Sequence, residues 1–215
     1  MYVRPLTGLG RTDKEWDDIR LACYREGRSL LLSEGYTQVS MRMFRQGGQG
    51  GQGRQGSHLS PLSPPSPVYC CQADGMIGLG CGARSYTNTL HYSNEYAVGA
   101  KGISDILQAY IQTADESFDY AHYGFQLDAE EQHRRYILLS LLSNEGLNCA
   151  SYRQQFGSEL YADFPEFSEL LAFNLAIKDE DILQLTEFGI ERSDTIGAWL
   201  FSEKVQELMQ GYKLK

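Results

Sequence analysis

A low-complexity stretch interrupts this chain of 215 residues and limits where a folded core can form. Between residues 46 and 67, glutamine recurs at every third position among glycines, and a segment rich in serine and proline follows. Such a composition cannot bury enough apolar surface to offset the entropy lost on ordering. We therefore expect a disordered insert at 46–67, with ordered sequence on either side. A proline-rich ligand for an SH3-like partner is the alternative interpretation of the insert.

The residues before the insert predict one helix followed by one strand. Thr12 and Glu15 have the spacing of a capping box, which marks the N-terminus of a helix. Gly35 falls where the end of a helix favours a positive φ, and residues 36–44 show β-branched and aromatic side chains in rough alternation. Because helix, glycine and strand make half of a βαβ unit, we expect an α/β fold with a parallel sheet.

A run of alternating glycines after the insert is the best candidate for a ligand site. Gly78, Gly80 and Gly82 follow a short apolar segment that we interpret as the end of a buried strand. Glycine has no Cβ, so the backbone can turn sharply here and approach a nucleotide-like group closely. The alternative is a tight bend without a ligand. The dinucleotide fingerprint G-x-G-x-x-G is incomplete, because its last position is Ala83.

The segment after the glycine run predicts one amphipathic helix and one aromatic stretch. Apolar side chains recur with helical spacing from Ile103 to Ile111. Residues 118–125 are rich in aromatic side chains, and we expect a connection or an edge strand there.

From Asp128 onwards the pattern becomes that of short, compact helices. Asp128 and Glu131 form a second capping box. We expect a helix that stops at Gly146, helices at 151–156 and 164–175, a hairpin over 182–190, and a last helix that Ser193 caps and that extends to Leu208. This order predicts a small winged-helix-like module. Its third helix carries two glutamates and no basic residue, so we interpret the module as a packing or lid domain and not as a DNA reader.

Composition argues against several partners. The chain has 28 acidic and 19 basic residues and a net charge of -9, which disfavours a nucleic-acid-binding surface. No segment approaches the roughly 20 apolar residues that span a bilayer, and the first residues lack the apolar core of a secretion signal. The five cysteines are odd in number and irregularly spaced, as is typical of reduced thiols. We expect a cytoplasmic protein without nucleic-acid or membrane partners.

The cysteines and histidines form no recognisable metal motif. Cys70 and Cys71 are adjacent and Cys81 lies ten residues further on, which matches neither zinc nor iron–sulfur spacing. The four histidines lie in separate segments. His91 is near enough to the glycine run to face the same cleft, although a surface or structural role is the simpler interpretation. We assign no catalytic residue and no metal ligand.

Several segments in this order resemble the C-terminal part of the oxygen-independent coproporphyrinogen III oxidase-like (HemN-like) radical SAM proteins. Gly35-Tyr36 closes a helix and opens a strand, and residues 74–85 look like the family's G-x-G-x-x-A-x-S strand end. Residues 134–141 (RRYILLSL) and 185–190 (LTEFGI) are similar to its C-terminal helical domain. The resemblance covers residues 3–45 and 68–212.

The resemblance implies the C-terminal strands of a partial (β/α)6 radical SAM barrel, followed by a winged-helix-like helical cap. Residues 1–45 would hold a barrel helix and strand, 68–127 the last barrel strand and helix, and 128–215 the C-terminal helical domain. The family's cofactors are S-adenosylmethionine and a [4Fe-4S] cluster, and its substrates are tetrapyrroles.

The same resemblance implies which residues approach a cofactor. Gly78, Gly80, Gly82 and Ala83 would lie where the lip of the barrel meets S-adenosylmethionine. Ligands of such barrels bind at the C-terminal ends of the strands, which agrees with glycines at this position.

One departure from the family changes the expected activity. The cluster motif C-x-x-x-C-x-x-C is absent from these residues. We therefore expect a C-terminal fragment that is inactive alone and whose partner is an N-terminal half carrying the cluster. The alternative is a non-enzymatic haem- or partner-binding module that uses His91 or His122 beside the aromatic segment.

Overall fold

The computed structural model describes residues 13–46, 75–94 and 99–211, with side-chain placements from residue 18 onwards in the first range. Contacts divide the chain into two compact units. The first consists of Met1–His58 and Ile137–Phe201, and the second of Leu59–Tyr136 and Ser202–Lys215.

Several sequence-based predictions fall outside the described residues. These are the insert at 46–67 except for Gln46, the capping box at Thr12 and Glu15, and the pair Cys70 and Cys71. Gln46 itself is the last residue of a strand and not the beginning of an insert.

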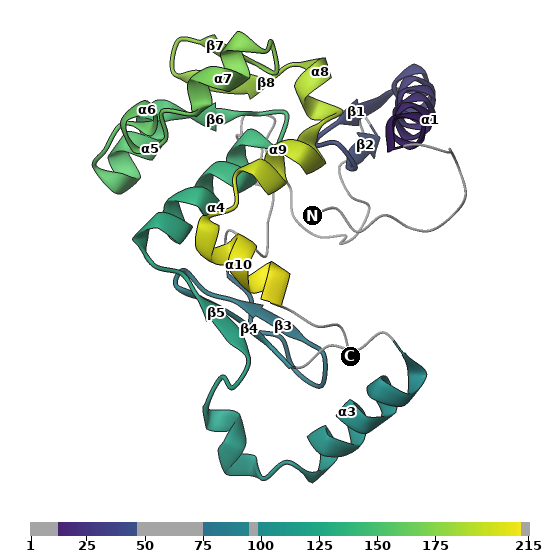
Figure 1. Ribbon diagram of the computed structural model, residues 1–215, viewed down its shortest axis with the longest axis vertical. Helices are drawn as coiled ribbons and strands as arrows, with labels where there is room; N and C mark the ends of the chain where they lie inside the picture. The colour runs from purple at the N-terminus through teal and green to yellow at the C-terminus, as the bar shows by residue number, and fades with distance from the viewer. Residues whose placement is uncertain (1–12, 47–74, 95–98, 212–215) are drawn as a thin grey trace, which may run out of the picture. The chain divides into compact units, whose positions relative to one another are not determined.

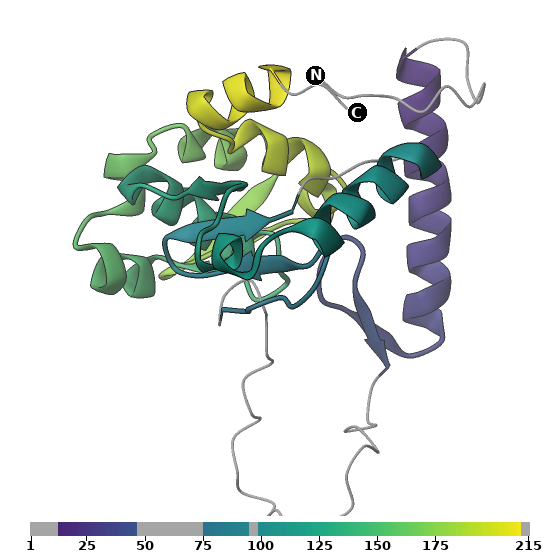
Figure 2. The ribbon, with the colours of Figure 1, turned by 90° about the horizontal axis from the view of Figure 1, so that it is seen from below.

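The first unit begins with one long helix, α1 (Asp13–Ser33), which runs unbroken in Figure 2. Gly35 follows it with a φ of 82°, the left-handed conformation that glycine adopts without steric cost. The predicted helix and its terminating glycine are both confirmed.

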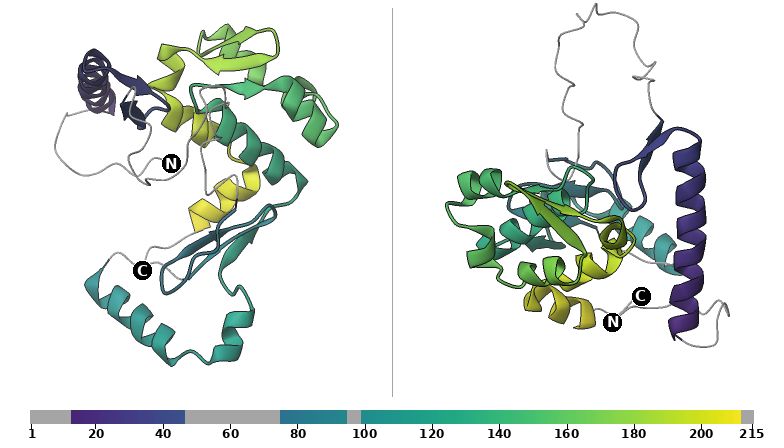
Figure 3. Two further views of the ribbon diagram at one scale, coloured as in Figure 1. Left: turned by 180° about the vertical axis from the view of Figure 1, so that it is seen from behind. Right: turned by 90° about the horizontal axis from the view of Figure 1, so that it is seen from above.

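The predicted single strand over 36–44 is wrong. β1 (Tyr36–Gln38) and β2 (Phe44–Gln46) are the two arms of an antiparallel hairpin at the C-terminal end of α1, visible in Figure 3. The chain reverses between them, where the Val39 N–H donates to the Met43 carbonyl at 2.8 Å. Alternating side chains fit one long strand as well as two short ones, so the pattern could not place the turn. All pairings between the described strands are antiparallel, so the expected parallel sheet is not found among them.

The rest of the first unit surrounds a three-stranded sheet with the order β6-β8-β7, seen in Figure 1. Its largest fully buried side chains include Tyr152, Phe167 and Leu183. α4 precedes the sheet and contributes to both units. In chain order the elements are α4 (Ala129–Leu141), β6 (Leu147–Asn148), α5 (Cys149–Phe156), α6 (Leu160–Asp163), α7 (Phe167–Ala172), β7 (Ala176–Asp179), β8 (Ile182–Leu185), α8 (Glu187–Ile190) and α9 (Ser193–Trp199).

Two predictions for this region need correction. The hairpin pairs β8 with β7, which precedes it, whereas residues 187–190 of the predicted hairpin form the helix α8. Thr186 caps α8 by accepting the Gly189 N–H at 3.0 Å, a local interaction that competes with extended backbone. The predicted last helix is in fact two helices, α9 and α10 (Glu203–Gly211). Ser193 is the first residue of α9 and does not cap it, because its hydroxyl donates to the Ile190 carbonyl.

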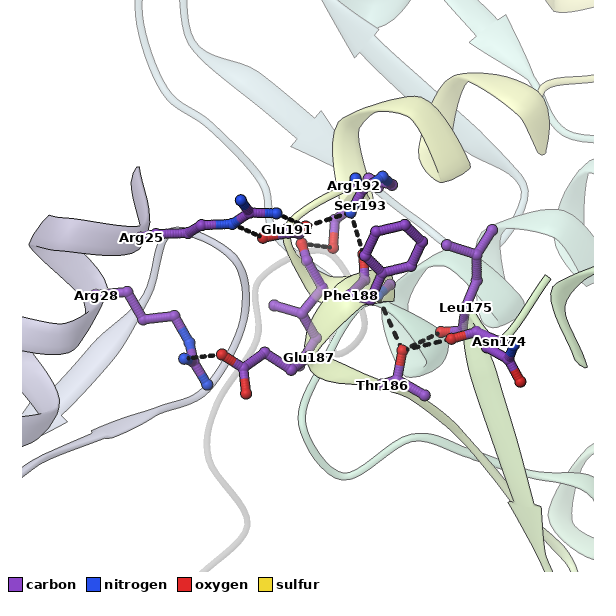
Figure 4. A network of polar contacts seen from close by, with 12 residues as sticks. Arg25, Arg28, Asn174, Leu175, Thr186, Glu187, Phe188, Glu191, Arg192 and Ser193 are labelled. Carbon is purple, nitrogen blue, oxygen red and sulfur yellow. Dashed lines mark hydrogen bonds and ion pairs between the residues drawn. The ribbon is translucent and has the colours of Figure 1, made fainter. Parts of the chain in front are cut away.

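Ion pairs hold α1 and the turn after β1 against α8 and α9 within this unit. Arg25 donates two hydrogen bonds of 2.7 Å to the buried Glu191, which Arg192 also contacts. Arg28 pairs with Glu187 at 2.5 Å, as Figure 4 shows. In the same unit, Arg20 and Arg42 both contact Asp194.

The second unit contains a separate three-stranded antiparallel sheet with the order β3-β4-β5. The predicted helix over 103–111 is confirmed as α3, and the aromatic segment 118–125 leads from η1 into β5 at the edge of the sheet. Its elements are β3 (Arg84–Tyr86), β4 (Leu90–Ser93), α3 (Ala100–Gln112), η1 (Asp115–Asp119), β5 (Gly124–Gln126) and α10. Among the described residues, none of the helices combines the length and apolar composition needed to cross a bilayer.

Candidate functional site

The glycine run forms a tight turn that folds back on β3. Met76 and Tyr86 exchange backbone hydrogen bonds of 2.9 and 2.8 Å, and the Ala83 N–H donates to the Gly80 carbonyl at 3.2 Å. Gly80 and Gly82 have φ values of 94° and 75°, which other residues rarely adopt. Among the described residues, Met76 pairs only through an isolated bridge, and Ile77 is exposed, so the predicted buried strand end is wrong.

The residue types at positions 78 and 85 explain why this turn lies against the sheet. The buried Ser85 hydroxyl accepts the Gly78 N–H at 3.0 Å. A Cβ on Gly78 would lie 2.5 Å from the Arg84 carbonyl oxygen, so no larger residue fits there without a shift. The turn therefore packs on the sheet face to which Ser85 points.

A cavity of about 560 Å³, the glycine cavity, lies beside this turn. Gly78, Gly80 and Ala83 line it, whereas the fourth predicted residue, Gly82, does not. The remaining lining comes from Ile77 and Leu79 of the turn, from Ser85 of β3, from residues 92–94 in and after β4, from α3 and from the segment through η1 towards β5. Its aromatic members are Tyr92, Tyr110, Phe118, Tyr120 and Tyr123.

A second cavity of about 660 Å³, the α10 cavity, is formed between α10 and the sheet of the same unit. Successive residues of a strand point to opposite faces. The cross-strand partners Tyr86, His91 and Phe125 therefore share one face with Arg84 and Ser93, and all five line this cavity. Val205, Leu208 and Met209 of α10 line its other side.

His91 lies in the α10 cavity and does not line the glycine cavity, so the alternative that it faces the cleft of the glycine run is wrong. Its ring makes an edge contact with Tyr86 at 4.9 Å between centroids. Burial and the nearby positive charge of Arg135 lower the pKa of His91, so that the neutral imidazole is favoured. Within the described part of the chain, its Nε2 atom is buried and has no hydrogen-bond partner.

His122 lines the glycine cavity and differs from His91 in its hydrogen bonding. Its Nε2 lies 3.0 Å from the Ser117 carbonyl oxygen and must donate to it, because a carbonyl only accepts. The two histidines that the sequence associated with one aromatic surface therefore belong to different cavities.

The start of α10 is fixed by polar contacts that the sequence analysis missed. Ser202 donates to the buried carboxylate of Glu131 and accepts the Val205 N–H at 3.1 Å, so it caps α10. Lys204 pairs with Asp128 at 2.9 Å and lies over the Phe125 ring at 5.0 Å. A serine followed by an acidic residue, as at Ser202 and Glu203, is typical of a helix start. This pattern could have revealed the break between α9 and α10.

Neither the cysteines nor the acidic residues of the described chain assemble a metal centre. No group of three or more His, Cys, Asp or Glu side chains within these ranges could hold an ion. Cys23, Cys81 and Cys149 are free thiols, and burial raises the pKa of Cys149. The described residues therefore do not fit a [4Fe-4S] cluster.

Comparison with known proteins identifies the region that follows β5. Residues 127–191 match the family model of the HemN C-terminal domain. This region is similar to HemN C-terminal domains. Coproporphyrinogen III oxidase (HemN) from Escherichia coli, a radical SAM enzyme, is similar in structure over 88% of this chain, with a TM-score of 0.55 and 19% sequence identity. This chain spans 42% of that protein's length.

At this level of identity, the similarity to HemN establishes the fold, which is mixed α/β. The resemblance to the C-terminal portion of the HemN-like family, inferred from residues 134–141 and 185–190 among others, is confirmed. No curated protein sequence matches this chain.

Proposed function

We propose that this chain is the C-terminal portion of a coproporphyrinogen III oxidase-like radical SAM protein, and that its glycine cavity holds the adenosine part of S-adenosylmethionine. The observation that carries this proposal is the position of the turn at 78–83. Its sequence resembles the family's strand end, and its backbone lines a cavity within the size range of cofactor sites.

The lining of the glycine cavity fits a nucleoside. Tyr110, Phe118 and Tyr120 offer aromatic surface for a purine ring, and Ser117 offers a hydroxyl for a ribose. No carboxylate lines this cavity in the part of the chain that the structure describes. The positively charged methionine end therefore has no counter-charge here, and we assign it to the cluster-bearing portion of the protein.

On this proposal, this chain and the cluster-bearing portion of the protein contribute different parts of the chemistry. Bound beside a [4Fe-4S] cluster, S-adenosylmethionine supplies one-electron radical chemistry, for which a tetrapyrrole is the substrate class that the family suggests. The residues of this chain orient the adenosine and exclude water from it. The order of elements from α4 to β8, with its β7–β8 hairpin, supports a winged-helix-like cap.

Nucleoside binding tests the cavity assignment. We expect S-adenosylmethionine and adenosine to bind the purified chain with similar affinity in calorimetric titrations, since only the adenosine part finds contacts. Ala109→Trp places an indole in the cavity from the exposed surface of α3 and should abolish binding. Gln108→Trp adds the same group at an exposed neighbour outside the lining and should bind as the wild type does. Equal binding by the two variants would contradict the assignment.

The cluster assignment has its own test. After reconstitution with iron and sulfide, the purified chain should remain colourless, and co-expression with a cluster-bearing N-terminal portion should yield a brown complex. A brown protein from this chain alone would refute the assignment of the cluster to the other portion.

A second candidate function is a haem-binding module, which the unpartnered Nε2 atom of His91 favours. Neutral imidazole is the form that ligates iron. Haem titration should then shift the Soret band, and His91→Ala should abolish the shift. His122→Ala should retain it, because the Nε2 atom of His122 already donates to Ser117.

A further inference from the structure

The α10 cavity carries chemistry that binding of S-adenosylmethionine on the other sheet face does not use. Its lining is largely apolar, and Leu208 and Met209 remain 55% and 58% exposed although they face the sheet. Apolar side chains that stay in contact with water leave unrealised hydrophobic free energy, which a ring-shaped ligand would recover. Met209 suits such a role, because its unbranched side chain adapts to the shape of a ligand.

The polar groups of the cavity favour an anion. No acidic side chain belongs to its lining in the described part of the chain. Arg84 lines it, and within the same residues its guanidinium makes no hydrogen bond or ion pair. A guanidinium without a partner at the rim of an apolar cavity is well suited to a carboxylate, with which it forms two parallel hydrogen bonds.

A second polar group can orient a ring. His91 Nε2 is buried within the sheet face that lines the cavity, and a buried nitrogen without a partner costs free energy until one is supplied. A hydroxyl or carbonyl on a flat ligand could satisfy it.

We propose that the α10 cavity binds a flat aromatic acid, with Arg84 paired to its carboxylate and His91 Nε2 hydrogen-bonded to a polar substituent on the ring. The site uses Arg84 and His91, which do not line the glycine cavity, although the two cavities share Ser85, Tyr92, Ser93 and Tyr123 in their linings. His91 acts here as a hydrogen-bond partner and not as the iron ligand of the second candidate function. A tetrapyrrole and a smaller aromatic acid share this chemistry, and titration with a porphyrin distinguishes these two kinds of ligand.

The test uses fluorescence titration of the full chain with 6-hydroxy-2-naphthoate as the probe. We expect saturable binding that weakens about tenfold or more when the probe lacks its carboxylate (2-naphthol) or when Arg84 is replaced in Arg84→Gln, with no further loss when both are changed together. The same result is expected for the second contact. Binding should weaken when the probe lacks its hydroxyl (2-naphthoate) or in His91→Phe, with no further loss when both are changed together.

Two controls separate this site from general effects. Lys101→Gln removes the same charge from an exposed position on α3 outside the lining and should leave binding unchanged. Leu208→Trp fills the cavity and should abolish binding while the circular dichroism spectrum stays that of the wild type. Absence of saturable binding, or equal losses in Arg84→Gln and Lys101→Gln, would overturn the proposal.

Porphyrins identify the source of the ligand. Iron-free protoporphyrin IX that binds through Arg84 would support the proposal and indicate a tetrapyrrole. Naphthoate binding without porphyrin binding would support it and indicate a smaller acid. Haem binding that requires His91 and not Arg84, together with failure of the naphthoates, would overturn it in favour of simple iron ligation.

Discussion

At the scale of single residues, one buried hydrogen bond determines where α10 begins. Ser202 both caps the helix and satisfies the carboxylate of Glu131. Ser202→Ala leaves that buried acceptor without its donor, so we expect the free energy of unfolding to fall by about 1–3 kcal/mol. Urea denaturation followed by circular dichroism measures the change. Ser104→Ala, at an exposed position of α3, is the matched control, and an equal loss in both would show that the Glu131 contact is unimportant.

A glycine of α8 illustrates a different residue-scale constraint. A Cβ on Gly189 would lie 2.0 Å from the Leu175 carbonyl oxygen, whereas one on Gly27 of α1 meets nothing within 4 Å. Gly189→Ala should therefore destabilise the first unit by about 1–3 kcal/mol, as overpacked sites do. Gly27→Ala should stabilise it by about 0.5–1 kcal/mol through helix propensity. Trp199 fluorescence during urea unfolding would report both, and a stabilising Gly189→Ala would contradict this packing.

At the scale of elements, α1 is held by charge more than by apolar burial. Its residues Ile19, Leu30 and Leu32 remain exposed, and the contacts to α8 and α9 come from arginines. How much each of these ion pairs stabilises the fold depends on how deeply its carboxylate is buried. Glu191 is buried, while Glu187 is 72% exposed and its pair with Arg28 is expected to contribute little.

The buried pair predicts how stability depends on pH. Hydrogen bonds from Arg25 lower the pKa of Glu191 below its ordinary value of 4.5. Because the folded state holds the proton less tightly than the unfolded state, the stabilisation is complete above pH 4.5 and is lost as pH falls through the lower folded value. Glu191→Gln should flatten this acid limb in thermal unfolding measured from neutral pH downwards. Glu187→Gln should keep the wild-type profile, and a flattened limb in both variants would argue against a specific role for Glu191.

At the scale of the whole molecule, α3 has no buried residue and presents Ile103, Leu107 and Ile111 to solvent, the last 80% exposed. An apolar stripe of this kind promotes association. We expect the purified chain to aggregate at moderate concentration, and co-expression with the proposed cluster-bearing portion to increase its solubility. Leu107→Lys combined with Ile111→Lys should reduce light scattering. Gln108→Lys combined with Gln112→Lys adds the same charge beside the stripe, and an equal improvement would show that charge alone is responsible.

Local signals predicted much of this architecture and failed at specific places. Periodicity located α1 and α3, and Asp128 accepts the Glu131 N–H at 3.1 Å as the capping pattern suggested. The carboxylate of Glu131 bonds instead to Ser202, 71 positions away in sequence, which no local pattern contains. The strand over 36–44 and the hairpin over 182–190 were misplaced because alternation does not reveal where a chain reverses.

The sequence by itself determined the positions of the main helices, the sharp turn at the glycines and the relation to the HemN C-terminal domain. Each depends on neighbouring residues or on an ordered set of short motifs. Only the tertiary structure decided that the sheets are antiparallel, that His91 and His122 lie in different cavities, and that Arg84 joins His91 beside α10. Strand register and the packing of distant elements set these, and both arise from contacts between residues far apart in the chain.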